Sequence, residues 1–233
     1  MTHENSRGDI MGLRIGLQFF GGRGASSGGV AGGIGGGSGG VRPTDTTSLI
    51  SAREGYRSEV DQVLEVMRQF SNRYGLQITD AQIAMLPPSQ AGVMAYYDNR
   101  GNMAINALYF NTAQMDATYD DCVTSGWHPS RGDRTGLEAT SAHELGHAIT
   151  EEAGRRAGYG DWAIDRVSSE VVNKARQQLG LKTQGEVGKA ISGYGAQNNA
   201  ECIAEAVSDV WCNGANASNA SKVVFNVLDS YFN

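Results

Sequence analysis

Residues 137–157 read LEATSAHELGHAITEEAGRRA, and this stretch decides how the rest of the chain is interpreted. A helix is predicted from about Leu137 to Ala157, because apolar residues recur at steps of three and four on one stripe: Ala142, Leu145 and Ile149. Four residues advance a helix by about 400°, so His143 and His147 share a face one turn apart. Two imidazoles in that arrangement can reach one Zn²⁺ at ~2.0 to 2.1 Å.

Glu144 completes an HExxH motif between these histidines. The helix turns its side chain towards the same side, where it can reach a water on the metal and act as a general base. The motif therefore predicts a catalytic face that points into a cleft. The alternative is an ordinary helix on which two histidines are satisfied by hydrogen bonds.

A third metal ligand is expected from a later helix, over about residues 199–213. No third histidine follows in the HExxHxxGxxH spacing, but AECIAEAVSD (200–209) places acidic residues at steps of four: Glu201, Glu205 and Asp209. One helix turned towards the metal can deliver Glu201 as a ligand and Glu205 as the acceptor that holds a histidine tautomer. The alternative is a solvated acidic face, which the surrounding Ala, Cys, Ile and Val disfavour.

The pair of motifs resembles a known family. HELGHAI (143–149), followed by Tyr194 in YGAQNNAECIAEA (194–206), looks like the catalytic domain of anthrax lethal factor and the related Pro-Pro endopeptidases, a branch of the gluzincins. The resemblance covers roughly residues 50–231 in layout and implies a zincin-like fold. It also implies that Tyr194, seven residues before the ligand Glu201, points at the metal-bound substrate oxygen.

The function expected from these residues is that of a zinc-dependent endopeptidase. Zn²⁺ held by His143, His147 and Glu201 would activate a water, Glu144 would be the base, and Tyr194 would donate a hydrogen bond to the oxyanion. The second possibility is a non-catalytic zinc-binding structural or interaction protein, for example a component of a phage particle. An intact Glu144 and Tyr194 count against it, because a purely structural site needs neither.

Residues 1–45 are expected to form a flexible tail ahead of a single domain over residues 46–233. The chain has 32 Gly, and 15 of them fall in this segment, whose composition offers little to offset the entropy of ordering. Its apolar stretch LRIGLQFF (13–20) is either a docking peptide or a short sticky segment. The run GLQFFGGRGASSGG (16–29) is similar to N-terminal segments of phage and prophage-encoded proteins, which hints at a mobile-element origin.

The remaining pattern predicts an α+β fold, mostly helical, with a small sheet or hairpin beside the motif helix. Strands are expected at about 92–97 and 103–110, joined by a turn, and the outer strand would pair with an extended peptide substrate; which of the two lies at the edge stays open. Tyr96, Tyr97 and Tyr109 would line the cleft or, more commonly for strand aromatics, the core. The helices are expected at about 48–74, 161–179, from 183, 199–213 and 219–231.

Composition excludes several other classes. A net charge of −6 and a pI near 5.2 argue against a general nucleic-acid binder, which needs clustered Lys and Arg. No apolar run approaches the ~20 residues that span a bilayer, and no signal peptide is expected. The three cysteines form no disulfide framework. His128, in a loop before a proline, is expected to be structural or exposed.

Overall fold

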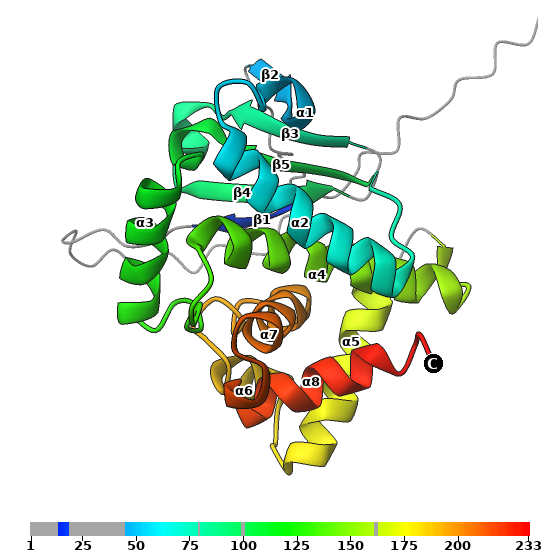
Figure 1. Ribbon diagram of the computed structural model, residues 1–233. Coiled ribbons are helices and arrows are strands. Elements are labelled where there is room, and N and C mark those ends of the chain that lie inside the picture. Colours follow the sequence, from blue (N-terminus) through cyan, green and yellow to red (C-terminus); the bar gives the residue numbers. More distant parts are fainter. Residues whose placement is uncertain (1–13, 19–44, 79, 99–100, 161–162) are drawn as a thin grey trace, which may run out of the picture.

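The computed structural model describes residues 14–18, 45–78, 80–98, 101–160 and 163–233 (Figure 1). The helices are α1 (Leu49–Ala52), α2 (Arg57–Tyr74), α3 (Thr112–Thr124), α4 (Gly136–Arg156), α5 (Ala163–Leu179), α6 (Gln184–Lys189), α7 (Asn199–Asn213) and α8 (Asn219–Asp229). The strands are β1 (Arg14–Gln18), β2 (Asp45–Ser48), β3 (Asp80–Met85), β4 (Val93–Asp98) and β5 (Asn102–Asn106). The fold is therefore α+β with helices dominant, as predicted.

The strands form one mixed sheet in the order β1-β4-β5-β3-β2. β3 and β5 are parallel, whereas β2, β4 and β1 each run antiparallel to their neighbours. The predicted hairpin is β4 and β5, joined by a turn in which Gly101 adopts a φ of 82°. Such a left-handed conformation is readily available only to glycine.

Strand β1 lies inside the segment that the sequence predicted to be a flexible tail. Residues 14–18 pair with β4, and most of the rest of residues 1–45 lies outside the described part of the chain. A strand here was not predicted, because its partner is more than 70 residues away and its own five residues include a glycine.

Helix α4, which carries the HExxH motif, lies at the centre of the molecule. It contacts α2, α3, α5 and α7 as well as β4 and β1, and Figure 1 shows it between the sheet and the C-terminal helices. Its first turn is fixed by a capping box, in which Thr135 accepts from the Glu138 amide and Glu138 accepts from the Thr135 amide. Because elements pack on it from several sides, most of the helix surface is buried. Ala142, Leu145 and Ile149 face the core as predicted.

A close approach of two helices brings the two motifs together. A Cβ added to Gly146 of α4 would lie 2.8 Å from the Cα of Ala204 in α7. The missing side chain lets the two backbones nearly touch, so that the first turn of α7 reaches the histidines.

The sequence located most elements but not all of them. The helices predicted at 137–157 and 199–213 match α4 and α7, and the predicted helix starting at Thr183 begins with the expected capping box to Glu186. The helix expected over 48–74 is interrupted at residues 53–56, and residues 107–109 form a 3₁₀ turn in place of strand. Strand β3 and helix α3, which Asn111 caps, were not predicted.

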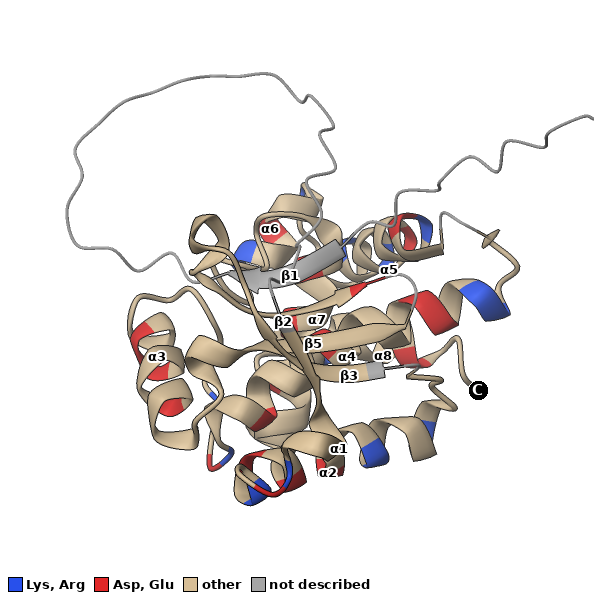
Figure 2. Cartoon of the chain, turned by 90° about the horizontal axis from the view of Figure 1, so that it is seen from above, with Lys and Arg blue, Asp and Glu red and all other residues tan. Residues whose placement is uncertain are grey.

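The charged residues are distributed along the whole fold, and the cysteines lie on α3 and α7. Seen from above (Figure 2), Lys and Arg are scattered among Asp and Glu. Cys122, Cys202 and Cys212 are free. Within the described residues, no helix has the length and apolarity needed to cross a membrane.

Candidate metal centre

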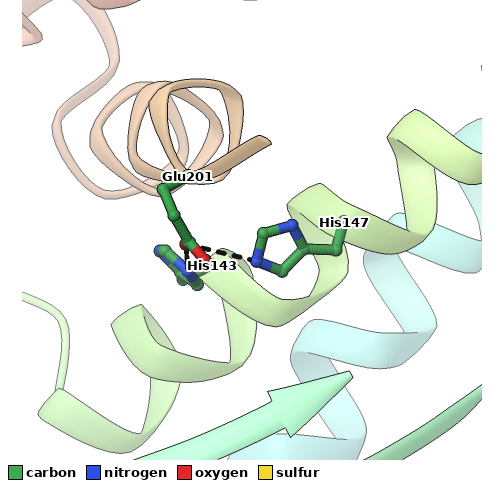
Figure 3. Close-up of side chains that lie close together, drawn as sticks. All are labelled: His143, His147 and Glu201. Atoms are coloured by element: carbon green, nitrogen blue, oxygen red, sulfur yellow. Dashed lines mark hydrogen bonds and ion pairs between the residues drawn. The ribbon is translucent and has the colours of Figure 1, made fainter. Parts of the chain in front are cut away.

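Helices α4 and α7 bring His143, His147 and Glu201 into one buried group (Figure 3). Nε2 of His143 lies 3.1 Å from Oε2 of Glu201, and Nε2 of His147 lies 3.4 Å from the same oxygen. Asn198 fixes the start of α7 by accepting from the Glu201 amide at 2.9 Å, which places Glu201 in the first turn. The three residues predicted as ligands are thus together.

The spacing of these atoms suits a small tetrahedral cation. Two donors that each lie ~2.0 to 2.1 Å from a tetrahedral centre are about 3.3 Å apart, close to the two distances from Oε2 of Glu201. Two imidazoles and one carboxylate form a donor set that Zn²⁺ accepts, although other divalent metals accept it too. The geometry and the donors therefore fit a metal ion.

His147 supports the same interpretation, because it has a polar side chain that its surroundings do not satisfy. Within the described part of the chain, Nδ1 of His147 has no hydrogen-bond partner and Nε2 has only the 3.4 Å contact with Glu201, although the residue is fully buried. Burial lowers the pKa of His147, so its imidazole is held neutral. A neutral imidazole is the form that binds a metal.

His143 is oriented from behind by Glu205. Nδ1 of His143 lies 2.8 Å from Oε1 of Glu205, so the Nδ1 side faces this carboxylate and Nε2 faces Glu201. The structure thus places Glu205 where the sequence predicted an acceptor that holds a histidine tautomer.

Two further residues hold Glu205, and sequence reasoning did not assign them. Nδ1 of His128 lies 3.1 Å from each oxygen of Glu205, and the Ser192 hydroxyl donates to Oε2 at 2.7 Å. His128 is buried, and its ring stacks on Tyr119 with centroids 5.3 Å apart. His128 is therefore a structural member of this network; its place in a loop gave no periodic signal that could have shown this.

Opposite charges partly offset one another within the group when it holds no metal. Burial would raise the pKa of Glu201 and Glu205, but the neighbouring histidines lower both to about 2. Burial would lower the pKa of His143, yet its hydrogen bonds with Glu201 and Glu205 raise it to about 10. An imidazolium at His143 thus occupies the electrostatic role that a bound cation would take over, and metal binding must release its proton.

Tyr194 lies against the metal group. Its ring centroid is 5.7 Å from that of His143. Its amide donates to the carbonyl of Trp127 at 3.0 Å, and its ring packs on the Trp127 ring with centroids 5.5 Å apart. Burial and the nearby charge of Glu201 raise the pKa of Tyr194 above its ordinary value, so its hydroxyl stays a hydrogen-bond donor.

Glu144 lies beside the same group and is fully buried. Its charge contributes to the raised pKa of Tyr194. The five site residues each expose at most 5% of their surface: His143, Glu144, His147, Tyr194 and Glu201. The cleft expected beside them stays a prediction.

A pocket of about 550 Å³ lies further along α4, on the side that faces β4. Tyr97 of β4 and Glu151 of α4 line it, and the Tyr97 hydroxyl donates to Glu151 at 2.7 Å. Tyr97 thus lines a pocket although most of its side chain is buried. Tyr96 belongs to a small core cluster. Tyr109 donates its hydroxyl to the Ala91 carbonyl.

The remaining acidic residue of the predicted stripe has a different role. Asp209 accepts from the side chain of Asn213 and from the Ser218 amide, at 2.8 and 3.0 Å. It therefore connects α7 to the start of α8 and takes no part in the metal group.

Comparison of the chain with protein-family models, with curated proteins and with solved structures found no match.

Proposed function

We propose that this chain is a zinc-dependent endopeptidase of the gluzincin type, with a zincin-like fold. The observation that carries the proposal is the convergence of His143, His147 and Glu201 with Glu205 behind His143. Glu144 and Tyr194 beside the same atoms supply the other two groups that peptide hydrolysis requires.

The chemistry divides between the metal and the chain. A zinc ion bound here supplies a water of lowered pKa and an electrophile for the peptide carbonyl. Glu144 takes the proton from the attacking water and returns it to the leaving amine. The Tyr194 hydroxyl donates a hydrogen bond to the carbonyl oxygen as negative charge develops there. Glu205 keeps Nε2 of His143 directed at the metal.

The substrate would be an extended peptide. β4 contacts the motif helix, and the Tyr97–Glu151 hydrogen bond joins the two. A peptide that takes the place of the edge strand β1 beside β4 gains backbone hydrogen bonds along its length. The pocket lined by Tyr97 and Glu151 is suited to one of its side chains.

The full burial of the site is the one observation that favours the alternative, a structural zinc protein without turnover. Both functions predict a bound metal, so metal content alone does not separate them. Glu144 does, because a structural site has no use for a base.

The test is therefore metal analysis and a peptide-library digest of the purified full chain, with Glu144→Gln alongside. We expect one zinc per chain, cleavage by the wild type, and a Glu144→Gln protein that keeps its zinc and cleaves nothing. A folded wild type that stays metal-free in excess zinc would refute the metal site. A zinc-loaded wild type that cleaves no peptide would leave the structural alternative.

A further inference from the structure

Strand β4 has two neighbours that differ in how the chain connects them. On one side it pairs with β5 through the short turn at Gly101; on the other it pairs antiparallel with β1, from Arg14 opposite Asp98 to Gln18 opposite Val93. β1 is the outermost strand on that side, and removing it would leave β4 as the edge of the sheet.

Along the chain, residues 19–44 connect β1 to the next strand. The next strand in sequence, β2, lies at the opposite edge of the sheet, so no hairpin fixes β1 in place. Twelve of residues 19–44 are Gly. β1 is thus a short strand on a long Gly-rich connection, which can leave β4 without breaking any other strand pair.

The place that β1 takes is also the place where a substrate would have to bind. β1 contacts the motif helix α4 as well as β4. An extended peptide that pairs with β4 beside α4 has this side alone to use, because β5 fills the other. The burial of all five site residues in the full chain agrees with an occupied substrate edge.

We propose that residues 14–18 occupy this β4 edge in cis, as a displaceable, substrate-like strand that keeps peptides out of the site. The proposal rests on the proposed peptidase function for the identity of the peptides that are excluded. Because residues 14–18 belong to the same chain as β4, their effective concentration at this edge is set by the connection and is roughly millimolar for linked segments. A peptide in trans must therefore bind more tightly than residues 14–18, or be more concentrated, before it can enter.

The register of the pairing is defined residue by residue. Arg14 stands opposite Asp98, and Ile15 stands opposite Tyr97, which lines the pocket.

The experiment uses the full chain with Gly16→Pro and Leu17→Pro combined. Neighbouring strand residues point their N–H groups to opposite sides, so one of the two prolines removes an N–H directed at β4. The matched control carries Gly36→Pro and Gly37→Pro, the same change in the connection. All forms also carry Glu144→Gln in the binding measurement, so that the probe is not cleaved.

The probe is a fluorescein-labelled peptide of residues 13–20, followed by anisotropy. We expect it to bind the strand variant at least tenfold more tightly than the control. Amide exchange of residues 93–98 should be faster in the strand variant and slow again when the peptide is added. Equal affinity for both proteins would overturn the proposal, and so would loss of the folded circular dichroism spectrum in the strand variant, since β1 would then be a required strand.

A second measurement, with Glu144 intact and zinc bound, separates this proposal from the peptidase function. We expect kcat/KM for a cleavable peptide to be at least tenfold higher in the strand variant, through a lower KM. Cleavage that is equal in variant and control would overturn cis occupancy and leave the peptidase standing. Tighter peptide binding with no cleavage by any form would refute the peptidase and support the occupied edge.

Discussion

Oε1 of Glu205 lies 2.8 Å from Nδ1 of His143, and this contact decides which ring nitrogen His143 turns towards Glu201. Because a carboxylate can only accept, Nδ1 carries a proton. When a metal is bound, Nε2 is then the nitrogen with a free lone pair. One residue of α7 thus orients a ligand on α4, while Glu201, one turn earlier on the same helix, is itself a ligand candidate.

Replacing Glu205 with Gln should weaken zinc binding by roughly 10- to 100-fold, the usual effect of losing a partner behind a ligating histidine. The amide has one acceptor oxygen in place of the two that hold His128, His143 and Ser192. Competition with a chromophoric chelator measures the change.

Asp209→Asn is the matched control for this change. It makes the same acid-to-amide replacement one turn further along α7, where Asp209 contacts Asn213 and Ser218. Its zinc affinity should equal that of the wild type. Equal zinc affinity in the Glu205→Gln protein would instead show that His143 needs no acceptor behind it.

The metal-free chain should lose stability in acid through the same carboxylate. The pKa of Glu205 is lowered from 4.5 to about 2, so the folded state binds fewer protons than the unfolded state between these values. The contribution of Glu205 to the free energy of unfolding is full above pH 4.5 and is lost as the pH falls to about 2. It is on the order of 3 kcal/mol, since one pKa unit corresponds to about 1.36 kcal/mol.

Urea unfolding of the chelator-treated protein between pH 7 and pH 2 tests this dependence. The Glu205→Gln protein should start less stable at pH 7 and show a flatter decline below pH 4.5. Parallel curves for the two proteins would mean that Glu205 is not the titrating group.

The sequence predicted which helical side chains come together at this site far better than it predicted their surroundings, for a physical reason. His143, His147, Glu201 and Glu205 lie on helices, where a spacing of four residues determines which side chains share a face. His128 and Ser192 come from loops, and only the tertiary fold brings them to Glu205. Spacing along the chain therefore contains no information about them.

Strand β1 shows the same limit for the fold. Its residues RIGLQ alternate apolar with other residues, but the run is only five residues long and sits within a Gly-rich stretch. Pairing with β4 supplies the partner that local sequence cannot show. The hairpin of β4 and β5 could be predicted because its turn and both strands are adjacent in sequence.

Gly146→Ala should destabilise the protein even though alanine is the better helix former. The added Cβ would lie 2.8 Å from the Cα of Ala204, a backbone atom that cannot give way unless α7 moves. Overpacking of this kind costs about 1 to 3 kcal/mol, against a gain of about 1 kcal/mol in helix propensity. Thermal melts should show a lower Tm, and zinc affinity should fall as Glu201 moves away with α7.

Gly185→Ala in α6 is the control, because no atom lies within 4 Å of its added Cβ. That protein should be as stable as the wild type or slightly more so. If Gly146→Ala behaves like Gly185→Ala, then α4 and α7 have room to adjust, and their close approach is not what positions Glu201.

Tyr194→Phe tests the group that the resemblance singled out. The ring packs against Trp127 and His143, so phenylalanine keeps these contacts and removes only the hydroxyl. If that hydroxyl stabilises the developing oxyanion, the transition state loses roughly 2.7 to 4 kcal/mol, and kcat falls about 10²- to 10³-fold. KM should change little, because the charge on the oxygen develops only in the transition state.

The matched control is Tyr109→Phe, which removes a hydroxyl that donates to the Ala91 carbonyl outside the metal group. It should leave kcat unchanged at a cost to stability of about 1 kcal/mol, typical of one lost hydrogen bond. Zinc content should match the wild type in both proteins, since neither tyrosine is among the three proposed ligands. A kcat for Tyr194→Phe within a few-fold of the wild type would show that Tyr194 supports His143 by packing alone, and the oxyanion would then need a different donor.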